Sequence, residues 1–150
     1  MKETYPIPAP LYKKIIATMP IPCVDVVLVH GKKFLLGLRK NKPAQAQWWF
    51  PGGRVQKGER LRHAAKRHVM MEVGARGVKI GEVLGAGETI FRNSAQGPAS
   101  HTINVVFLAD VPGGEYRPAN SENSQLKWFS KIGPRWHPYV REMLKKVGFK

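Results

Sequence analysis

Residues 52–75 join a Gly-Gly turn to a helix, and this unit constrains the fold more strongly than any other part of the chain. Its characteristic positions are Gly53, Glu59, Arg67, Glu72 and Gly74. Apolar residues recur at helical intervals over residues 60–73. A glycine follows directly, where it suits the left-handed conformation that ends many helices. The sequence therefore predicts a glycine turn followed by one amphipathic helix with a carboxylate near each end.

The spacing within this unit also predicts which side chains lie together. His68 and Glu72 are four residues apart, which is about 40° around a helix axis, so they share one face. The alternative for such a pair is a simple exposed contact. Arg67 meets Glu59 if the loop before the helix folds back, and that pair would orient the loop rather than perform chemistry. The Gly-Gly turn allows the backbone to approach a ligand closely.

Length and composition indicate one globular domain over residues 1–150. The chain has 43% hydrophobic and 23% charged residues, which is ordinary for a folded domain. It has neither a run of roughly 20 apolar residues nor an N-terminal secretory pattern, so we expect no membrane span and a cytoplasmic location. The single cysteine, Cys23, excludes an internal disulfide and precedes a valine-rich run, which favours a place in the core.

The net charge of +15 favours anionic partners, which include nucleotides, polyphosphates and nucleic acid. A solvated basic surface is the alternative explanation. Because the basic residues are spread along the chain without an Arg-rich tail, we favour a small-molecule nucleotide over nucleic acid. With only ten acidic residues in the sequence, a hard cation such as Mg²⁺ has few carboxylates to bind.

The rest of the chain predicts strands first, a helix in the middle, further strands and a final helix. We expect helices over residues 9–19, 60–73 and 138–147, and strands over residues 23–29, 33–39, 48–50, 78–91, 102–111 and 126–129. Polar loops are expected at residues 41–47 and 92–100. This order is typical of an α+β fold, here a mixed sheet sandwiched between helices.

The spacing of residues 52–75 resembles the Nudix box, G-x5-E-x7-R-E-U-x-E-E-x-G-U, in which U is a bulky aliphatic residue. The chain departs from the box at two acidic positions, His68 and Met71. The flanking segments that resemble the GDP-mannose mannosyl hydrolase branch of this family are residues 34–39, 41–45 and 51–57. That branch lacks the same two glutamates, so the departures favour it. The resemblance is clear over residues 22–75 and weaker to about residue 130.

The resemblance implies a Nudix fold, which is an α/β/α sandwich, and Mg²⁺-dependent hydrolysis of a nucleoside diphosphate derivative, with Mn²⁺ as an alternative ion. The branch implies a nucleotide sugar of the GDP-mannose type, whose sugar C1 is attacked by water. A homodimer is common in the family. By resemblance, the metal contacts are the Gly52 carbonyl and Glu72, the diphosphate contacts are Arg39 and Arg54, and Asp25 contacts substrate. Mg²⁺ and arginines suit the charge that develops on a diphosphate leaving group.

Residues 121–128 complete the implied site. With Trp128 as the anchor, the third metal ligand of the branch falls at Glu122, and its general base, a histidine, falls at Asn123. A glutamate suits Mg²⁺ well, but an amide is no useful base near neutral pH. The base is therefore left open between Glu122, His101 and a different reaction.

The resulting candidates fall into overlapping groups. The catalytic candidates are Arg39, Arg54, Glu72 and Glu122, and the metal candidates are Gly52, Glu72 and Glu122. The substrate-binding candidates are Asp25, Arg39, Arg54 and Trp48. Trp48 and its neighbour Trp49 are suited to stacking on a nucleobase, with core packing of an aromatic strand as the alternative.

Two other functions stay open on the sequence alone. One is conventional attack at phosphorus of another nucleotide. The other is a catalytically impaired Nudix-fold module that binds a nucleotide or RNA, which Asn123, Met71 and the basic charge motivate.

Overall fold

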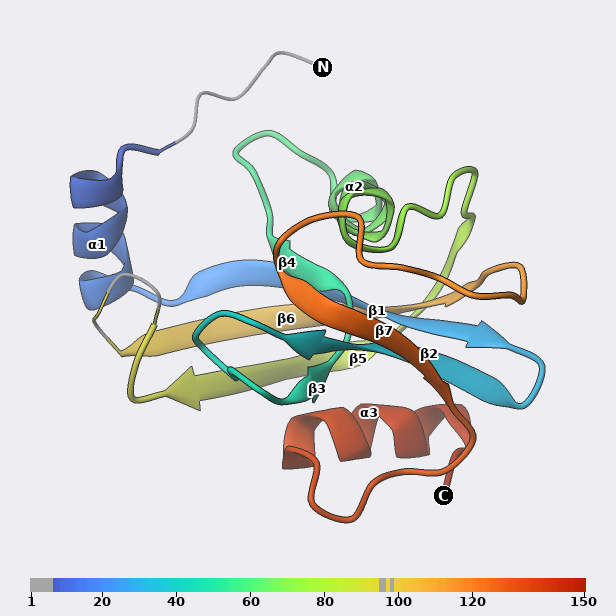
Figure 1. Ribbon diagram of the computed structural model, residues 1–150. Helices are drawn as coiled ribbons and strands as arrows, with labels where there is room; N and C mark the ends of the chain where they lie inside the picture. Colours follow the sequence, from blue (N-terminus) through green and yellow to red (C-terminus); the bar gives the residue numbers. More distant parts are fainter. Residues whose placement is uncertain (1–6, 95–96, 98) are drawn as a thin grey trace.

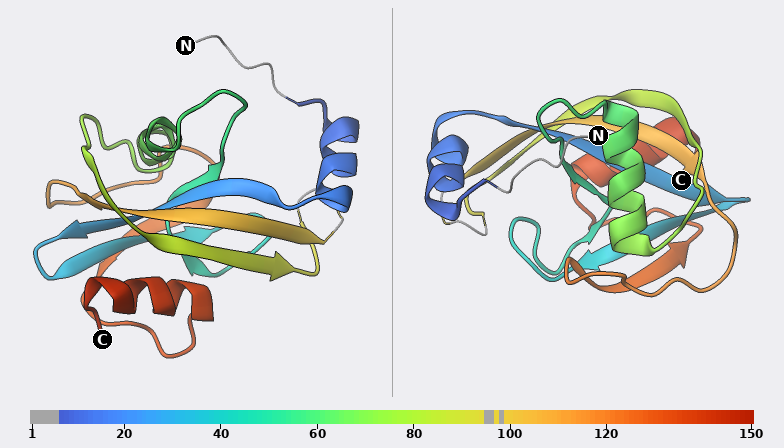
Figure 2. Two further views of the ribbon diagram at one scale, coloured as in Figure 1. Left: turned by 180° about the vertical axis from the view of Figure 1, so that it is seen from behind. Right: turned by 90° about the horizontal axis from the view of Figure 1, so that it is seen from above.

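The computed structural model describes residues 7–94, 97 and 99–150, and in this part of the chain three helices surround one β-sheet (Figure 1). The helices are α1 (Ala9–Thr18), α2 (Leu61–Val73) and α3 (Pro138–Val147). The strands are β1 (Ile21–His30), β2 (Lys33–Arg39), β3 (Trp48–Trp49), β4 (Gly52–Arg54), β5 (Ile80–Phe91), β6 (Ser100–Asp110) and β7 (Asn123–Phe129). Since α2 and α3 cover opposite faces of the sheet, the predicted α+β sandwich is confirmed (Figure 2).

The sheet has the order β3-β2-β1-β6-β5, with β4 beside β1 and β7 beside β2. β1 and β6 run parallel, whereas the other pairs are antiparallel, so the sheet is mixed as predicted. On its other side, β1 changes partner: residues 23–25 pair with β4, and residues 28–30 pair with β2. The sheet divides at this change of partner, where Asp25 lies opposite Gly52.

β1 is buried on both faces because helices cover both, which explains its nearly continuous apolar sequence. Successive residues of β1 belong to two core clusters: Val24, Val26 and Leu28 to the one that includes α2, and Val27 and Val29 to the one that includes α3. Cys23 is buried in a small third cluster with Ile16 of α1, in agreement with its predicted core position.

The structure differs from the sequence prediction mainly at two strands. β4 occupies the expected glycine turn because Gly52 has no side chain to hold its backbone away from β1. A Cβ there would collide with the Asp25 carboxylate and the Val24 carbonyl. β7 begins at Asn123, three residues early, because Asn123 pairs with Arg39 of β2 rather than lying in a loop. Residues 1–6 and part of the loop expected at 92–100 lie outside the described residues.

No helix in the described part of the chain is long and apolar enough to cross a membrane.

α2 is fixed at both ends by the predicted residues. Gly74 ends the helix in the left-handed conformation, with φ 74°. At the other end, the loop folds back so that Arg67 contacts Glu59 through two bonds, Nε–Oε1 at 2.7 Å and Nη2–Oε2 at 2.8 Å. Arg67 Nη2 also donates to the Arg54 carbonyl at 3.1 Å, and the Gln56 amide donates to Glu59 at 3.0 Å. The pair therefore ties β4 and the loop to α2, as the sequence predicts.

We expect Glu59→Gln to lower the free energy of unfolding by about 1.5–3 kcal/mol at pH 7, because a buried charged hydrogen bond is lost. The Glu59 side chain is only 1% exposed. The hydrogen bonds from Arg67 hold the pKa of Glu59 below its ordinary value of 4.5. The pair therefore contributes its full stability above that value and loses it as the pH falls through the lowered pKa of the folded state.

Urea denaturation of both proteins between pH 3 and pH 7 measures this difference. Glu115→Gln is the control, since Glu115 is 82% exposed and should change stability little. A gap between wild type and Glu59→Gln that stayed constant down to pH 3 would contradict this role.

Candidate active site

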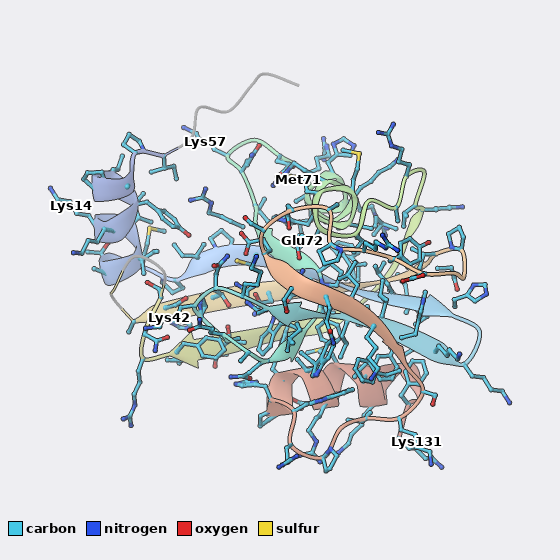
Figure 3. All side chains as sticks on the ribbon, in the orientation of Figure 1. Lys14, Lys42, Lys57, Met71, Glu72 and Lys131 are labelled. Carbon is cyan, nitrogen blue, oxygen red and sulfur yellow. The ribbon has the colours of Figure 1, made fainter. Side chains whose placement is uncertain are left out.

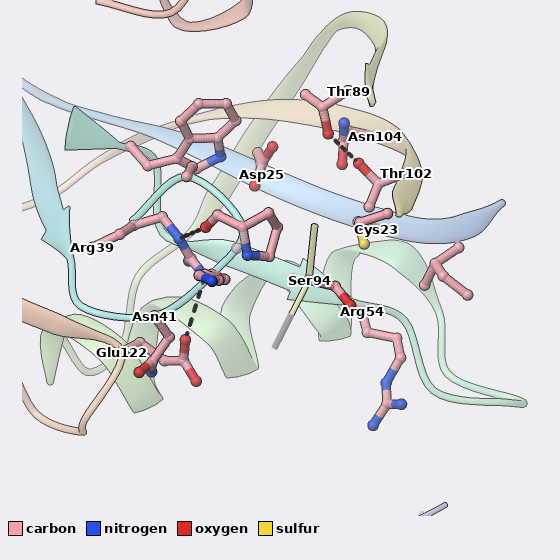
Figure 4. A pocket seen from close by; sticks show the side chains of 18 of the residues that line it. Cys23, Asp25, Arg39, Asn41, Arg54, Thr89, Ser94, Thr102, Asn104 and Glu122 are labelled. Carbon is pink, nitrogen blue, oxygen red and sulfur yellow. Dashed lines mark hydrogen bonds and ion pairs between the residues drawn. The ribbon is translucent and has the colours of Figure 1, made fainter. Parts of the chain in front are cut away.

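A cavity of about 400 Å³ opens where the sheet divides, and α1, α2, the strands β1 to β6 and the loop before β7 line it (Figure 4). The predicted site residues that it brings together are Asp25, Arg39, Gly52, Arg54, Glu72 and Glu122. Of the buried polar residues that the structure describes, all but Asn123 line this cavity. Because buried polar groups are costly without partners, their concentration here is typical of a ligand site.

Glu72 is the most enclosed carboxylate on the α2 side of the cavity, with 3% of its surface exposed (Figure 3). The Gly52 amide donates to its Oε1 at 3.2 Å, and Asn123 Nδ2 donates to its Oε2 at 3.4 Å. His68 Nδ1 lies 3.5 Å from Oε1. The expected shared face of His68 and Glu72 is thus confirmed, but the pair is enclosed rather than exposed.

The two glycines are needed because the β4 backbone passes unusually close to its neighbours. At Gly52, an added Cβ would collide with the neighbouring Asp25 carboxylate on β1. At Gly53, it would lie 2.7 Å from the His68 ring. His68 Nε2 is 3.1 Å from the Arg54 carbonyl, so it carries the hydrogen of that bond. The imidazole thereby fastens α2 to β4 and positions Glu72 beside Gly52.

The residues around Glu72 fit a divalent cation bound together with a substrate. Among the described residues, the sole ion-pair partner of Glu72 is His68, so no Lys or Arg neutralises this buried carboxylate. The described residues contain no cluster of three His, Cys, Asp or Glu side chains that would form a complete cage. Mg²⁺ is commonly bound by one or two carboxylates, water and substrate phosphates. Glu72, the more exposed Glu122 and the Gly52 carbonyl match that mode.

Two arginines, Arg39 and Arg54, line the same cavity (Figure 4). Arg39 donates from Nε to the Pro43 carbonyl at 2.9 Å, and its Nη2 lies 3.7 Å from Glu122 Oε2. The Arg54 guanidinium lies over the Tyr12 ring of α1, 4.3 Å from its centroid. Neither guanidinium is locked in a bidentate carboxylate pair. Both therefore retain donors for an anionic ligand.

Asp25 is a carboxyl group poised between its two protonation states. It is buried, and its Oδ2 accepts a 2.6 Å hydrogen bond from the Tyr139 hydroxyl. Removal from water raises the pKa of Asp25 to about 7, and the nearby charge of Glu72 adds to this, while the Tyr139 hydrogen bond opposes it. Burial and the Asp25 charge also raise the pKa of Tyr139, so its hydroxyl stays a donor.

The structure places two sequence candidates elsewhere. Trp48 packs edge-on against Phe129, with ring centroids 4.9 Å apart, in the core cluster that includes α3. Among the described residues, Trp49 rather than Trp48 lines the cavity, so Trp48 is not positioned to stack on a nucleobase. His101 pairs with the exposed Glu88 at 3.0 Å and is not among the described residues lining the cavity, which removes it as a base candidate.

A model of the NUDIX domain family matches residues 19–144 of the chain. The chain belongs to the Nudix family. A low-salt glycan biosynthesis protein, Agl8 of Haloferax volcanii, is 34% identical over 95% of this chain and 92% of its own length. An ADP-ribose pyrophosphatase of Methanocaldococcus jannaschii is 32% identical over 73% of this chain and 62% of its own. Among solved structures, a MutT NUDIX hydrolase from Burkholderia pseudomallei is similar, with a TM-score of 0.73 and 26% identity over 86% of this chain and 98% of its own.

Helix α1 lies before the matched Nudix region, yet it forms part of the cavity wall through Tyr12 and Ile16. Sequence reasoning missed these residues because a short amphipathic helix outside the motif carries no catalytic signal. It also missed Thr89, Thr102 and Asn104 on β5 and β6. A polar side chain at alternate positions of an otherwise apolar strand was the one signal that could have revealed them.

We expect Tyr12→Leu to weaken GDP binding about 2- to 5-fold, because a cation–π contact that positions Arg54 is lost. Tyr12→Phe keeps the ring and should bind GDP within about twofold of wild type. Isothermal titration calorimetry in the presence of Mg²⁺ measures both constants. Equal dissociation constants for the leucine and phenylalanine variants would show that the ring does not position Arg54.

Proposed function

We propose that this Nudix protein hydrolyses a nucleoside diphosphate derivative, specifically a nucleotide sugar of the GDP-mannose type, with Mg²⁺ or Mn²⁺. The observation that carries the proposal is the meeting of one buried, uncompensated carboxylate, Glu72, with Arg39 and Arg54 in a single cavity. The glycan biosynthesis protein and the ADP-ribose pyrophosphatase among its relatives support a substrate of this class. The box departures at His68 and Met71 support the sugar-releasing branch.

In this mechanism the chain binds the diphosphate and stabilises its departure. Arg39 and Arg54 contact the diphosphate and neutralise the charge that develops as it leaves. Glu72, Glu122 and the Gly52 carbonyl would hold the cation, which when bound would supply Lewis-acid chemistry at the diphosphate. Asp25, on the cavity floor at β1, contacts the substrate.

The attacking water needs a proton acceptor, and Asn123 cannot be one. We assign this role to Glu122, whose side chain is 43% exposed and lines the cavity beside Arg39. The water oxygen bonds to the sugar C1 and its proton passes to Glu122. The bond from C1 to the diphosphate oxygen breaks, and the nucleoside diphosphate departs with that electron pair. Asn123 instead positions Glu72 through the 3.4 Å hydrogen bond.

A hydrolysis screen of nucleotide sugars with Mg²⁺ tests the activity, and we expect release of a nucleoside diphosphate from GDP-mannose. Glu72→Gln should reduce kcat/KM by at least about 100-fold, since even outer partners of a metal site cost 10- to 100-fold. Glu82→Gln, on the exposed part of β5, is the matched control and should retain activity. Absence of any product across the panel, or full activity in Glu72→Gln, would refute the proposal.

Hydrolysis in water labelled with ¹⁸O separates this reaction from conventional Nudix chemistry. Attack at the sugar C1 places the label in the released sugar, and we expect this result. Label in the released phosphate would instead show attack at phosphorus. Both results are consistent with a hydrolase. Only label in the released sugar supports the sugar-releasing branch.

A nucleotide- or RNA-binding module without turnover is the second candidate. It is favoured by the net charge of +15 and by the position of Met71, which stands exposed at the cavity where the box has an acid. RNA binding that falls steeply with salt, combined with no hydrolysis in the same screen, would support this function over the first.

A further inference from the structure

We propose that Thr89, Thr102 and Asn104 form a neutral polar subsite that binds the uncharged half of the substrate, and that Asn104 determines specificity there. This inference rests on the proposed function, because it assumes a diphosphate held at the opposite part of the cavity. It extends that function by naming the chemistry of the group attached to the diphosphate. That group presents a hydrogen-bond donor and an acceptor side by side.

The three side chains lie together on one face of neighbouring strands (Figure 4). Thr89 of β5 is paired in register with Thr102 of β6, and their hydroxyl oxygens are 2.6 Å apart. Asn104 follows two residues later on β6, so it faces the same side of the sheet. All three line the cavity together with Asp25, which lies between this group and Arg39 in the view of Figure 4.

Of the three subsite residues, Asn104 is the one with a buried polar atom that lacks a partner among the described residues. It is 4% exposed, and its Nδ2 is buried with no hydrogen-bond partner among the described residues. Its neighbours across the sheet are Cys23 on β1 and Gly87 on β5. Neither has a side-chain amide or carboxylate that could accept a hydrogen bond from Nδ2. A buried amide without a partner is destabilising, so its retention at a cavity wall indicates that a ligand completes its hydrogen bonds.

The absence of charged groups among these three residues indicates what kind of ligand the subsite binds. Asn104 and the two threonines are uncharged, whereas the proposed diphosphate contacts, Arg39 and Arg54, are charged residues elsewhere in the lining. In the threonine pair one hydroxyl donates to the other, which leaves the second hydroxyl hydrogen for a ligand acceptor. The primary amide offers a donor and an acceptor in one plane. A nucleobase edge and the adjacent hydroxyls of a sugar both present the matching pattern.

Binding experiments with the two halves of GDP-mannose decide between these sources. We would titrate GDP and mannose 1-phosphate, each with Mg²⁺, into wild type, Asn104→Leu and Asn93→Leu, the last being an exposed asparagine control. Asn104→Leu keeps the number and branching of the side-chain heavy atoms but removes both polar atoms. We expect a roughly 3- to 10-fold higher dissociation constant for one half and no change for the other. An effect on GDP assigns the subsite to the nucleoside, and an effect on mannose 1-phosphate assigns it to the sugar.

The free protein gives a second readout that a merely structural asparagine would not produce. Removing an unpaired buried amide should raise the melting temperature of Asn104→Leu by roughly 2–4 °C, opposite in sign to its effect on binding. Unchanged binding of both compounds, whatever the melting temperature, would overturn the proposal. If Asn104→Leu does not fold, the near-isosteric Thr102→Val provides the same binding comparison.

The outcome is separable from that of the proposed function. If wild type releases no product from GDP-mannose, the hydrolase proposal fails, while the binding comparison still decides whether Asn104 recognises the ligand. If GDP-mannose is hydrolysed and Asn104→Leu binds both halves like wild type, only the subsite fails.

Discussion

The enclosure of the Glu72 carboxylate between α2 and β4 is the constraint on which the rest of the site depends. It requires the β4 backbone to pass close to β1 at Gly52 and close to the His68 ring of α2 at Gly53, where a side chain would collide. It also requires His68 and the Glu59–Arg67 pair to hold the strand against the helix. The result is a buried carboxylate that, among the described residues, has His68 but no Lys or Arg as an ion-pair partner. A divalent cation would balance such a charge, so the packing of the Nudix box favours a metal site here.

The cavity lining contains both charged side chains and a group of uncharged polar side chains. Arg39 and Arg54 supply the positive charge that suits a diphosphate, and the β5–β6 surface supplies neutral hydrogen-bonding groups. Asp25 lies at β1 where the sheet divides, with a pKa raised to about 7 by burial. A ligand with a diphosphate and an uncharged polar group is complementary to both parts. On the proposed function, this division favours a nucleoside diphosphate derivative over inorganic polyphosphate.

The sequence predicts the fold and the charged part of the site because periodicity and motif spacing are local. The four-residue spacing in α2 places His68 and Glu72 on one face of the helix. Most of the order of helices and strands follows from the patterns of apolar residues. The β4 strand is not predictable in this way, since Gly52 pairs with Asp25 only through the tertiary fold. The roles of Tyr12 and Asn104 are equally non-local, because α1 and β6 are far apart in the sequence and reach the same cavity only through the tertiary fold. The same holds for the two tryptophans. Trp49, and not Trp48, lines the cavity, and the tertiary fold decides which of the two faces it.

The proposed function depends on Glu72 binding the divalent cation, and direct measurement of metal binding tests this without requiring turnover. Mn²⁺ can be titrated into the protein with GDP present and followed by electron paramagnetic resonance of the free ion. Wild type should bind Mn²⁺, and Glu72→Gln should lose that binding by at least about tenfold while remaining folded. Equal Mn²⁺ affinity in wild type and Glu72→Gln would show that the buried carboxylate is structural and that the metal lies elsewhere.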